Sequence, residues 1–244
     1  MPIYPHQSAL LWPKYQLPPE ASSSDVTAFS RSGGPSLTNL NPATRTDRGA
    51  WRIELNGILM VDRGRRRTLD AISTYLGGRS GLIAVPIWAF DVNPFITGDG
   101  RGIQDGVTFS DGTTFSDGST FTATREIIAK TSGVTALSAT SIVIDMQNGA
   151  ADLTGVKFSW MHTAYKTGRA LDVTGTLWTV EITPAIRLAI PSGAELNFDD
   201  PTCLCRLSAD GGLRRGTNAA GHDTVSVTFD EATDYWSNLA AGLL

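Results

Sequence analysis

Two pairs of adjacent acidic residues are the first candidates for chemistry, Asp199-Asp200 and Asp230-Glu231. Paired carboxylates hydrolyse glycosides when they face each other across about 5–10 Å. Neighbours in one chain do not meet that requirement, so we interpret both pairs as solvated acids at turns or strand ends. His162 follows Trp160 and Met161 and has no evident partner in the sequence, so we interpret it as structural.

Other catalytic and metal-binding motifs are weak or missing. Residues 77–81 read GGRSG, which is not a nucleophile elbow because a glycine follows Ser80 directly. We find no phosphate loop, no dinucleotide fingerprint and no HExxH motif. The three histidines are scattered, and the spacing of the Asp-Gly pairs matches neither an EF-hand loop nor the nonapeptide calcium repeat. The sequence therefore predicts a protein without enzymatic activity, metal or cofactor.

The two cysteines form a Cys203-Leu204-Cys205 motif. In a strand their side chains point to the same face, at the limit of the Cα separation that a disulfide tolerates. We interpret them as reduced, half-buried small apolar residues. Because there is neither a secretory signal pattern nor an apolar run of about 18 residues, we expect a chain that folds in a reducing cytoplasm and has no membrane span.

Charge is spread thinly, with a net value of −4. No part of the chain is strongly basic, so no nucleic-acid specificity is expected. The exception is a short basic cluster at Arg63, Arg65, Arg66 and Arg67. Two interpretations remain open for it, a solvated helix start or a subunit contact.

Elements that would position any site are mostly short strands, since the chain is rich in Gly, Ser and Thr. In residues 50–62, Trp51, Ile53 and Leu55 alternate with polar residues, which indicates a strand. Residues 66–76 are the best helix, with an apolar stripe at Leu69, Ile72 and Leu76 followed by Gly77-Gly78 as a stop. Residues 82–90 read as a buried strand, in which Pro86 indicates an edge or a bulge.

A six-residue phrase is repeated in DGVTFSDGTTFSDGSTF, residues 105–121. Asp-Gly pairs favour tight turns, and the Thr and Phe residues between them favour extended backbone. We therefore expect a zigzag of turns that links two units, with Phe109, Phe115 and Phe121 as anchors.

Residues 125–199 look like a second, all-β unit. Strands are indicated at 140–146, 155–161, 176–183 and 186–190, and such short strands suit a small closed barrel. Strand alternation returns at 202–208 and 223–231, and residues 235–239 are expected to form a terminal helical turn.

The first 49 residues read as an extended arm, stiffened by prolines and carrying apolar side chains. The arm packs either on its own domain or on a neighbouring subunit. Candidate contacts with a partner subunit are Tyr4, Leu11, Trp12, Arg65, Arg66 and Arg67. The six tryptophans are scattered among apolar strand positions, where core packing is the ordinary use, although an exposed one would suit sugar stacking.

Four segments in order resemble tail-tip proteins of tailed bacteriophages that infect alphaproteobacteria, specifically the distal tail protein. They are WRIELNGILMVDRGRRRTLDAISTYLGGRSGLIAVPI, the Asp-Gly repeat, TLWTVEITPAIRLAIPSGAELNFDDP, and CLCRLS with TVSVTFDEA. The resemblance covers roughly residues 50–232 and excludes the N-terminal arm.

The resemblance implies a mainly β protein, with a sandwich or barrel ring-forming domain at 50–104 and 200–244 that includes one short α-helix. Residues 105–124 would link it to an inserted small barrel, OB-like or lectin-like, at 125–199. It further implies a homohexameric ring in the virion, assembled in the host cytoplasm and joining the tail tube protein to the hub proteins of the baseplate. The alternatives are another tail ring, such as a terminator or adaptor, or a carbohydrate-binding module that contacts the host surface.

Overall fold

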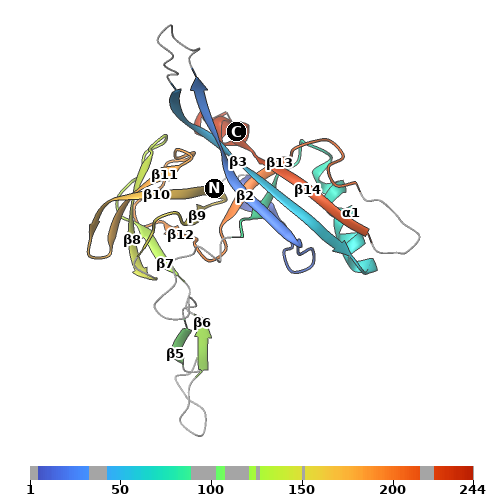
Figure 1. Cartoon of the computed structure of the whole chain (residues 1–244), viewed down its shortest axis with the longest axis horizontal. Coiled ribbons are helices and arrows are strands. Elements are labelled where there is room, and N and C mark those ends of the chain that lie inside the picture. The colour runs from blue at the N-terminus through green and yellow to red at the C-terminus, as the bar shows by residue number, and fades with distance from the viewer. Residues whose placement is uncertain are drawn as a thin grey trace.

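The computed structural model describes residues 5–32, 43–88, 103–107, 121–124, 127–149, 152–214 and 223–243 (Figure 1). Within residues 28–32, 43–48, 103–107 and 121–124 we describe the backbone alone. The protein is mainly β, as the sequence predicts, and its described strands form two six-stranded sheets and a two-stranded ribbon. Neither described helix is long and apolar enough to cross a membrane.

The first of these, the main sheet, combines strands from both ends of the chain. Its order is β1-β4-β13-β14-β3-β2, and all pairs are antiparallel except β1 with β4. The strands are β1 (Leu10–Leu11), β2 (Ala21–Ser32), β3 (Ala43–Met60), β4 (Ile83–Pro86), β13 (Thr202–Leu207) and β14 (Asp223–Glu231). Pro86 lies at the end of β4, beyond the two residues that pair with β1, where its missing N–H breaks no bond to that strand.

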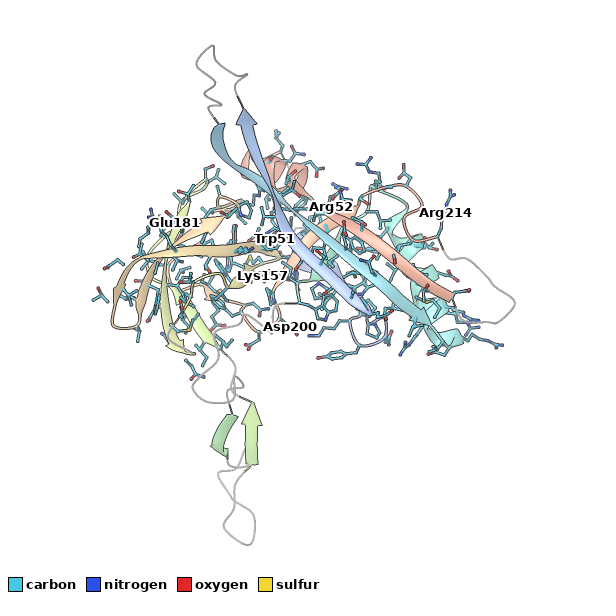
Figure 2. All side chains as sticks on the ribbon, in the orientation of Figure 1. Trp51, Arg52, Lys157, Glu181, Asp200 and Arg214 are labelled. Carbon is cyan, nitrogen blue, oxygen red and sulfur yellow. The ribbon has the colours of Figure 1, made fainter. Side chains whose placement is uncertain are left out.

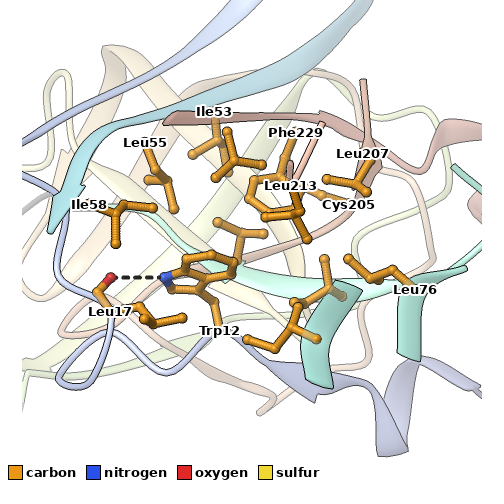
Figure 3. Packing of buried hydrophobic residues seen from close by; sticks show 14 of the residues in the cluster. Trp12, Leu17, Ile53, Leu55, Ile58, Leu76, Cys205, Leu207, Leu213 and Phe229 are labelled. Atoms are coloured by element: carbon orange, nitrogen blue, oxygen red, sulfur yellow. Dashed lines mark hydrogen bonds between the residues drawn. The ribbon is translucent and has the colours of Figure 1, made fainter. Parts of the chain in front are cut away.

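Alternation along β3 buries one face of the main sheet, as predicted. Trp51, Ile53 and Leu55 are fully buried, whereas Arg52 is exposed and Glu54 is partly exposed. Figure 3 shows the resulting core, in which Trp12 and Leu17 pack beneath Ile53, Leu55, Ile58 and Phe229. The Trp12 indole N–H donates to the Leu17 carbonyl at 3.3 Å, so this large side chain is buried with its polar atom paired.

The helix α1 (Arg63–Leu76) covers this core. Asp62 caps its start by accepting from the Arg65 N–H at 2.8 Å. Leu69, Ile72 and Leu76 are buried, which confirms the predicted stripe. The helix ends at Gly77, whose φ of 55° lies in the left-handed region that glycine adopts easily.

The second sheet lies wholly within residues 128–196, and we call it the barrel. Its strands are β7 (Ile128–Thr131), β8 (Ser141–Asn148), β9 (Lys157–Trp160), β10 (Thr163–Thr174), β11 (Leu177–Thr183) and β12 (Glu195–Leu196), in the order β12-β7-β8-β11-β10-β9. Ser159 and Asn197 exchange two backbone hydrogen bonds of 2.9 Å, which join the two ends of the sheet. This closure confirms the predicted small barrel and leaves its end strands covered.

The expected strand at 186–190 is wrong, because Ile190 forms a single bridge to Thr135 and the preceding residues are not extended in a ladder. Pro184 lacks the N–H needed to continue β11.

Helix α2 (Thr233–Ala240) packs on the other face of the main sheet. The sequence predicts one short α-helix and a terminal turn, and the turn is in fact this second helix. Its Tyr235 hydroxyl lies 2.8 Å from Nδ1 of His6, which belongs to a 3-10 turn, η1 (Pro5–Ser8). His6 is buried and its ring also packs on Trp236, with ring centroids 5.3 Å apart.

The N-terminal segment is therefore not a free arm where the structure describes it. Strands β1 and β2 extend the main sheet, and Trp12 is 1% exposed in the core of its own chain. The expectation that Trp12 contacts a partner subunit is wrong, because its indole has no free surface to offer.

The repeat region is described at its two ends alone. Strands β5 (Ile103–Val107) and β6 (Phe121–Thr124) pair as an antiparallel ribbon, with Val107 opposite Phe121. Asp105-Gly106 thus lies in a paired strand rather than in the expected turn, and the Asp-Gly turns expected at 111–112 and 117–118 lie outside the described residues. Phe109 and Phe115 lie outside the described residues, as does the side chain of Phe121, so their anchoring role stays a prediction.

Candidate functional site

A buried ion pair joins the barrel to the main sheet. Arg187 follows β11, and its Nε lies 2.9 Å from Oε1 of Glu231 at the end of β14. The other oxygen of Glu231 accepts from Arg187 Nη2 at 3.2 Å and from the Trp51 backbone N–H at 3.0 Å. The Glu231 side chain is fully buried, and these bonds satisfy its charge. Glu231, which its place in the sequence predicts to be solvated, is therefore a structural anchor.

One further contact crosses this junction, and a second, within the barrel, positions Arg187. The Trp51 indole N–H donates to the Ala164 carbonyl at 2.7 Å, and the Tyr165 hydroxyl accepts from the Arg187 N–H at 3.1 Å. Burial raises the pKa of Tyr165 to about 12, so the phenol stays protonated at physiological pH. The two units are thus held by specific, desolvated hydrogen bonds.

A groove runs along the outer side of this junction, between the N-terminal segment and the barrel. It consists of two adjoining cavities of about 400 and 380 Å³. Lys14, Tyr15, Pro86 and Asp200 line both. Pro18, Ile87, Trp88 and Asp199 complete the smaller cavity, and Leu11, Trp12, Pro13, His162, Asn197 and Thr202 complete the larger. In Figure 2, Asp200 marks this place between the barrel and the strands of the main sheet.

Lys14 and Asp200 form an ion pair within the groove. Partial burial by itself would lower the pKa of Lys14, but the hydrogen bond and charge of Asp200 outweigh it and raise the pKa. The Lys14 ammonium also lies 5.0 Å from the ring centroid of Tyr15, which is 85% exposed. Asn197 fixes the turn that carries Asp200, donating to its carbonyl at 2.8 Å and accepting from its N–H at 2.9 Å.

The inner end of the groove holds a histidine and a hydroxyl in contact. His162 Nδ1 lies 2.7 Å from Oγ1 of Thr202, which gives this histidine the partner that the sequence did not reveal. Burial lowers the pKa of His162, which favours the neutral imidazole. No carboxylate of the described residues hydrogen-bonds this imidazole, so a third group that would orient it as a catalytic base is missing from that part of the chain.

The predicted partner contacts are distributed over two places. Arg65 and Arg66 lie in the first turn of α1 and bind the end of β3, through the carbonyls of Leu59 and Met60 at 3.1–3.2 Å. Arg67 is exposed next to them, and Leu11 is 53% exposed at the groove. Tyr4 lies outside the described residues. Leu11 and Arg67 therefore remain the described candidates with open surface.

The aromatic residues of the barrel do not form a sugar-stacking platform. Across the described barrel residues 127–149 and 152–199, Phe158, Tyr165 and Phe198 are buried. Trp160 and Trp178 are half-buried against the barrel core. Two aromatic residues, Tyr15 and Trp88, line the groove, and the sequence does not predict this. Residues 15, 88 and 200 come together only in the tertiary structure, and no local pattern indicates that they are close.

The cysteines are free, buried and reduced in form. Burial raises the pKa of Cys203 well above its ordinary value, so its thiol is inert rather than nucleophilic. Groups of three or more His, Cys, Asp or Glu side chains suited to a metal ion are not found among the described residues.

No family model matches the chain, and no curated protein is similar to it.

Proposed function

We propose that this protein is a structural component of a bacteriophage tail tip, a distal tail protein whose copies form a closed ring between the tail tube protein and the hub. The proposal that the protein is a distal tail protein is based on the resemblance of four segments within residues 50–232. This resemblance implies a homohexamer in the virion, and the ring would close because each copy contacts the next through two different surfaces.

The observation that carries the proposal is a strand pair that runs past the main sheet. Phe29–Ser32 of β2 pair with Ala43–Thr46 of β3, whereas β14 pairs with β3 only between Arg52 and Met60. We call these residues, 29–32 and 43–46, the projecting ribbon, and Figure 1 draws it as an extension of β2 and β3 away from both sheets. A two-stranded ribbon is marginally stable alone in water, and its open edges favour pairing with another chain.

The rigid junction supports an assembly role as well. A ring subunit must keep its contact surfaces at a fixed angle, because small angular errors prevent closure. The buried Arg187–Glu231 pair and the Trp51–Ala164 hydrogen bond hold the barrel on the main sheet in this way.

The alternative on the barrel surface, a carbohydrate-binding module, loses its main support because the described barrel residues expose no aromatic pair. The choice among tail rings rests on the resemblance, which favours the distal ring.

Removing the projecting ribbon tests the proposal without disturbing the sheets. Thr27 pairs with Ala50, so replacing residues 28–48 by a single Asn joins the strands through an Asn-Gly turn that ends in Gly49. We expect the shortened chain to keep a β-type circular dichroism spectrum with cooperative unfolding and to sediment as a monomer, while the full chain sediments as a ring. A matched control replaces Gly175, at the β10–β11 turn, by Asn, which also tolerates its φ of 62°. A shortened chain that still forms the ring would contradict the role of the ribbon.

A further inference from the structure

We propose that the groove between the N-terminal segment and the barrel binds a neutral pyranose saccharide. The proposal concerns a surface separate from the projecting ribbon and does not rest on ring formation.

Aromatic walls are the first observation. Tyr15 is 85% exposed and Trp88 is half-buried, and both line the cavity of about 380 Å³ together with Pro18 and Pro86. Exposing a tyrosine to this degree leaves most of its apolar ring in water, and a partner with an apolar face would remove that area from water. The C–H face of a pyranose is such a partner.

Preformed polar groups at the same place are the second observation. A carboxylate offers about four acceptor sites and an ammonium three donors. Each Asp200 oxygen accepts a bond from Lys14, so the carboxylate retains acceptor sites for the vicinal hydroxyls of a sugar after these bonds are made. Asn197 holds the Asp200 turn through two hydrogen bonds, so little conformational freedom remains to be lost on binding.

Size and charge restrict the ligand. Each cavity is of the order of a ligand pocket, about 300–1,000 Å³, and together they accommodate more than one sugar ring. Asp199 and Asp200 line the smaller cavity, and Lys14 is the one cation among its described lining residues. The excess of negative charge disfavours uronic and sialic acids, and the pattern therefore selects a neutral sugar.

Saturation-transfer NMR on the full chain tests the site, with glucose, galactose, mannose and N-acetylglucosamine as probes. We expect transfer to at least one of them at millimolar affinity, strongest for the protons on one ring face. Tyr15→Ala should weaken that binding about tenfold or more, and Asp200→Asn should weaken it too because the ion pair and two acceptor sites are lost.

Tyr75→Ala is the matched control, because Tyr75 is 55% exposed on α1 and does not line the groove. It should leave the transfer unchanged. The proposal is overturned if none of the probes receives saturation at about 20 mM, or if the transfer survives in both the Tyr15 and Asp200 variants. Unchanged circular dichroism of the variants shows that a loss of binding is not a loss of folding.

Discussion

The Glu231 carboxylate at the end of β14 holds the Arg187 guanidinium of the barrel at 2.9 Å, and the Glu231 side chain is fully buried. Removing one partner leaves an uncompensated charge out of water. We expect Glu231→Ala to lower the free energy of unfolding by about 3–5 kcal/mol. Urea denaturation followed by tryptophan fluorescence measures the loss.

The matched control for this pair is Arg169→Ala. Arg169 pairs with Glu181 at a similar distance, 3.0 Å, but is 75% exposed. Its loss should cost less than about 1 kcal/mol. If the two variants were equally stable, the junction would not be the anchor that we describe.

Trp12 and Leu11 are neighbours with opposite environments. Trp12 is 1% exposed and its ring centroid lies 5.6 Å from that of Phe229, whereas Leu11 is 53% exposed. We expect Trp12→Ala to destabilise the monomer by about 3–5 kcal/mol through the cavity it leaves. Leu11→Ala should change stability by no more than about 0.5 kcal/mol. Thermal unfolding of both variants decides whether Trp12 serves the core, as the structure indicates, or a partner.

Protonation of His6 should weaken the docking of the N-terminal turn. Burial, with a smaller contribution from His162, lowers the pKa of His6 in the folded chain, so the unfolded chain binds the proton at higher pH. Stability is then complete above the unfolded pKa of about 6.5 and falls as the pH decreases through the lowered folded pKa. Each unit of lowering corresponds to about 1.4 kcal/mol.

Urea midpoints between about pH 8 and pH 5.5 measure this dependence. His6→Gln should flatten the curve, and His162, whose pKa is lowered in the same direction by burial, should contribute to the part that remains. An identical slope with and without His6 would contradict the assignment.

Arg67 is a positive charge near the N-terminus of α1, where the helix dipole disfavours cations. The start of α1 carries the positive end of the helix dipole, and Arg67, the fifth residue of the helix, is exposed just after the first turn. We expect Arg67→Glu to stabilise the monomer by about 0.3–1 kcal/mol in low salt. If Arg67 contacts a neighbouring subunit, which is one of the two interpretations of its cluster, the same variant should weaken the ring. A more stable monomer together with a weaker ring in sedimentation would show that Arg67 lies at the subunit contact. An unchanged ring would show that Arg67 does not take part in that contact.

Strands whose side chains alternate could be read from the sequence, as β3 and β14 show, and so could the stripe and stop of α1. β2 could not, because its serines have low strand propensity and its extension depends on pairing with β3. β10 was also missed, since Gly168 and its charged residues hide the alternation. The number of residues between two strands says little about whether the strands pair. The sequence could therefore predict that residues 125–199 form a small barrel, but it could not predict the order of the strands in it.

The candidate sites depended even more on tertiary contacts. Asp200 and Lys14 are 186 residues apart, and the partners Glu231 and Arg187 are 44 apart. A single sequence carries no local signal for either pair. Glu231 is a further example. Its position next to Asp230 predicts a solvated acid at a strand end, whereas the structure buries its side chain completely.

The mass of the purified protein in solution tests the central claim most directly. Light scattering over a range of concentrations should give one particle whose mass is a fixed multiple of 26.0 kDa, a hexamer by resemblance, because a closed ring has no free contact at which to grow. A mass of 26.0 kDa at every concentration, or a mass that rises continuously, would contradict a self-closing ring.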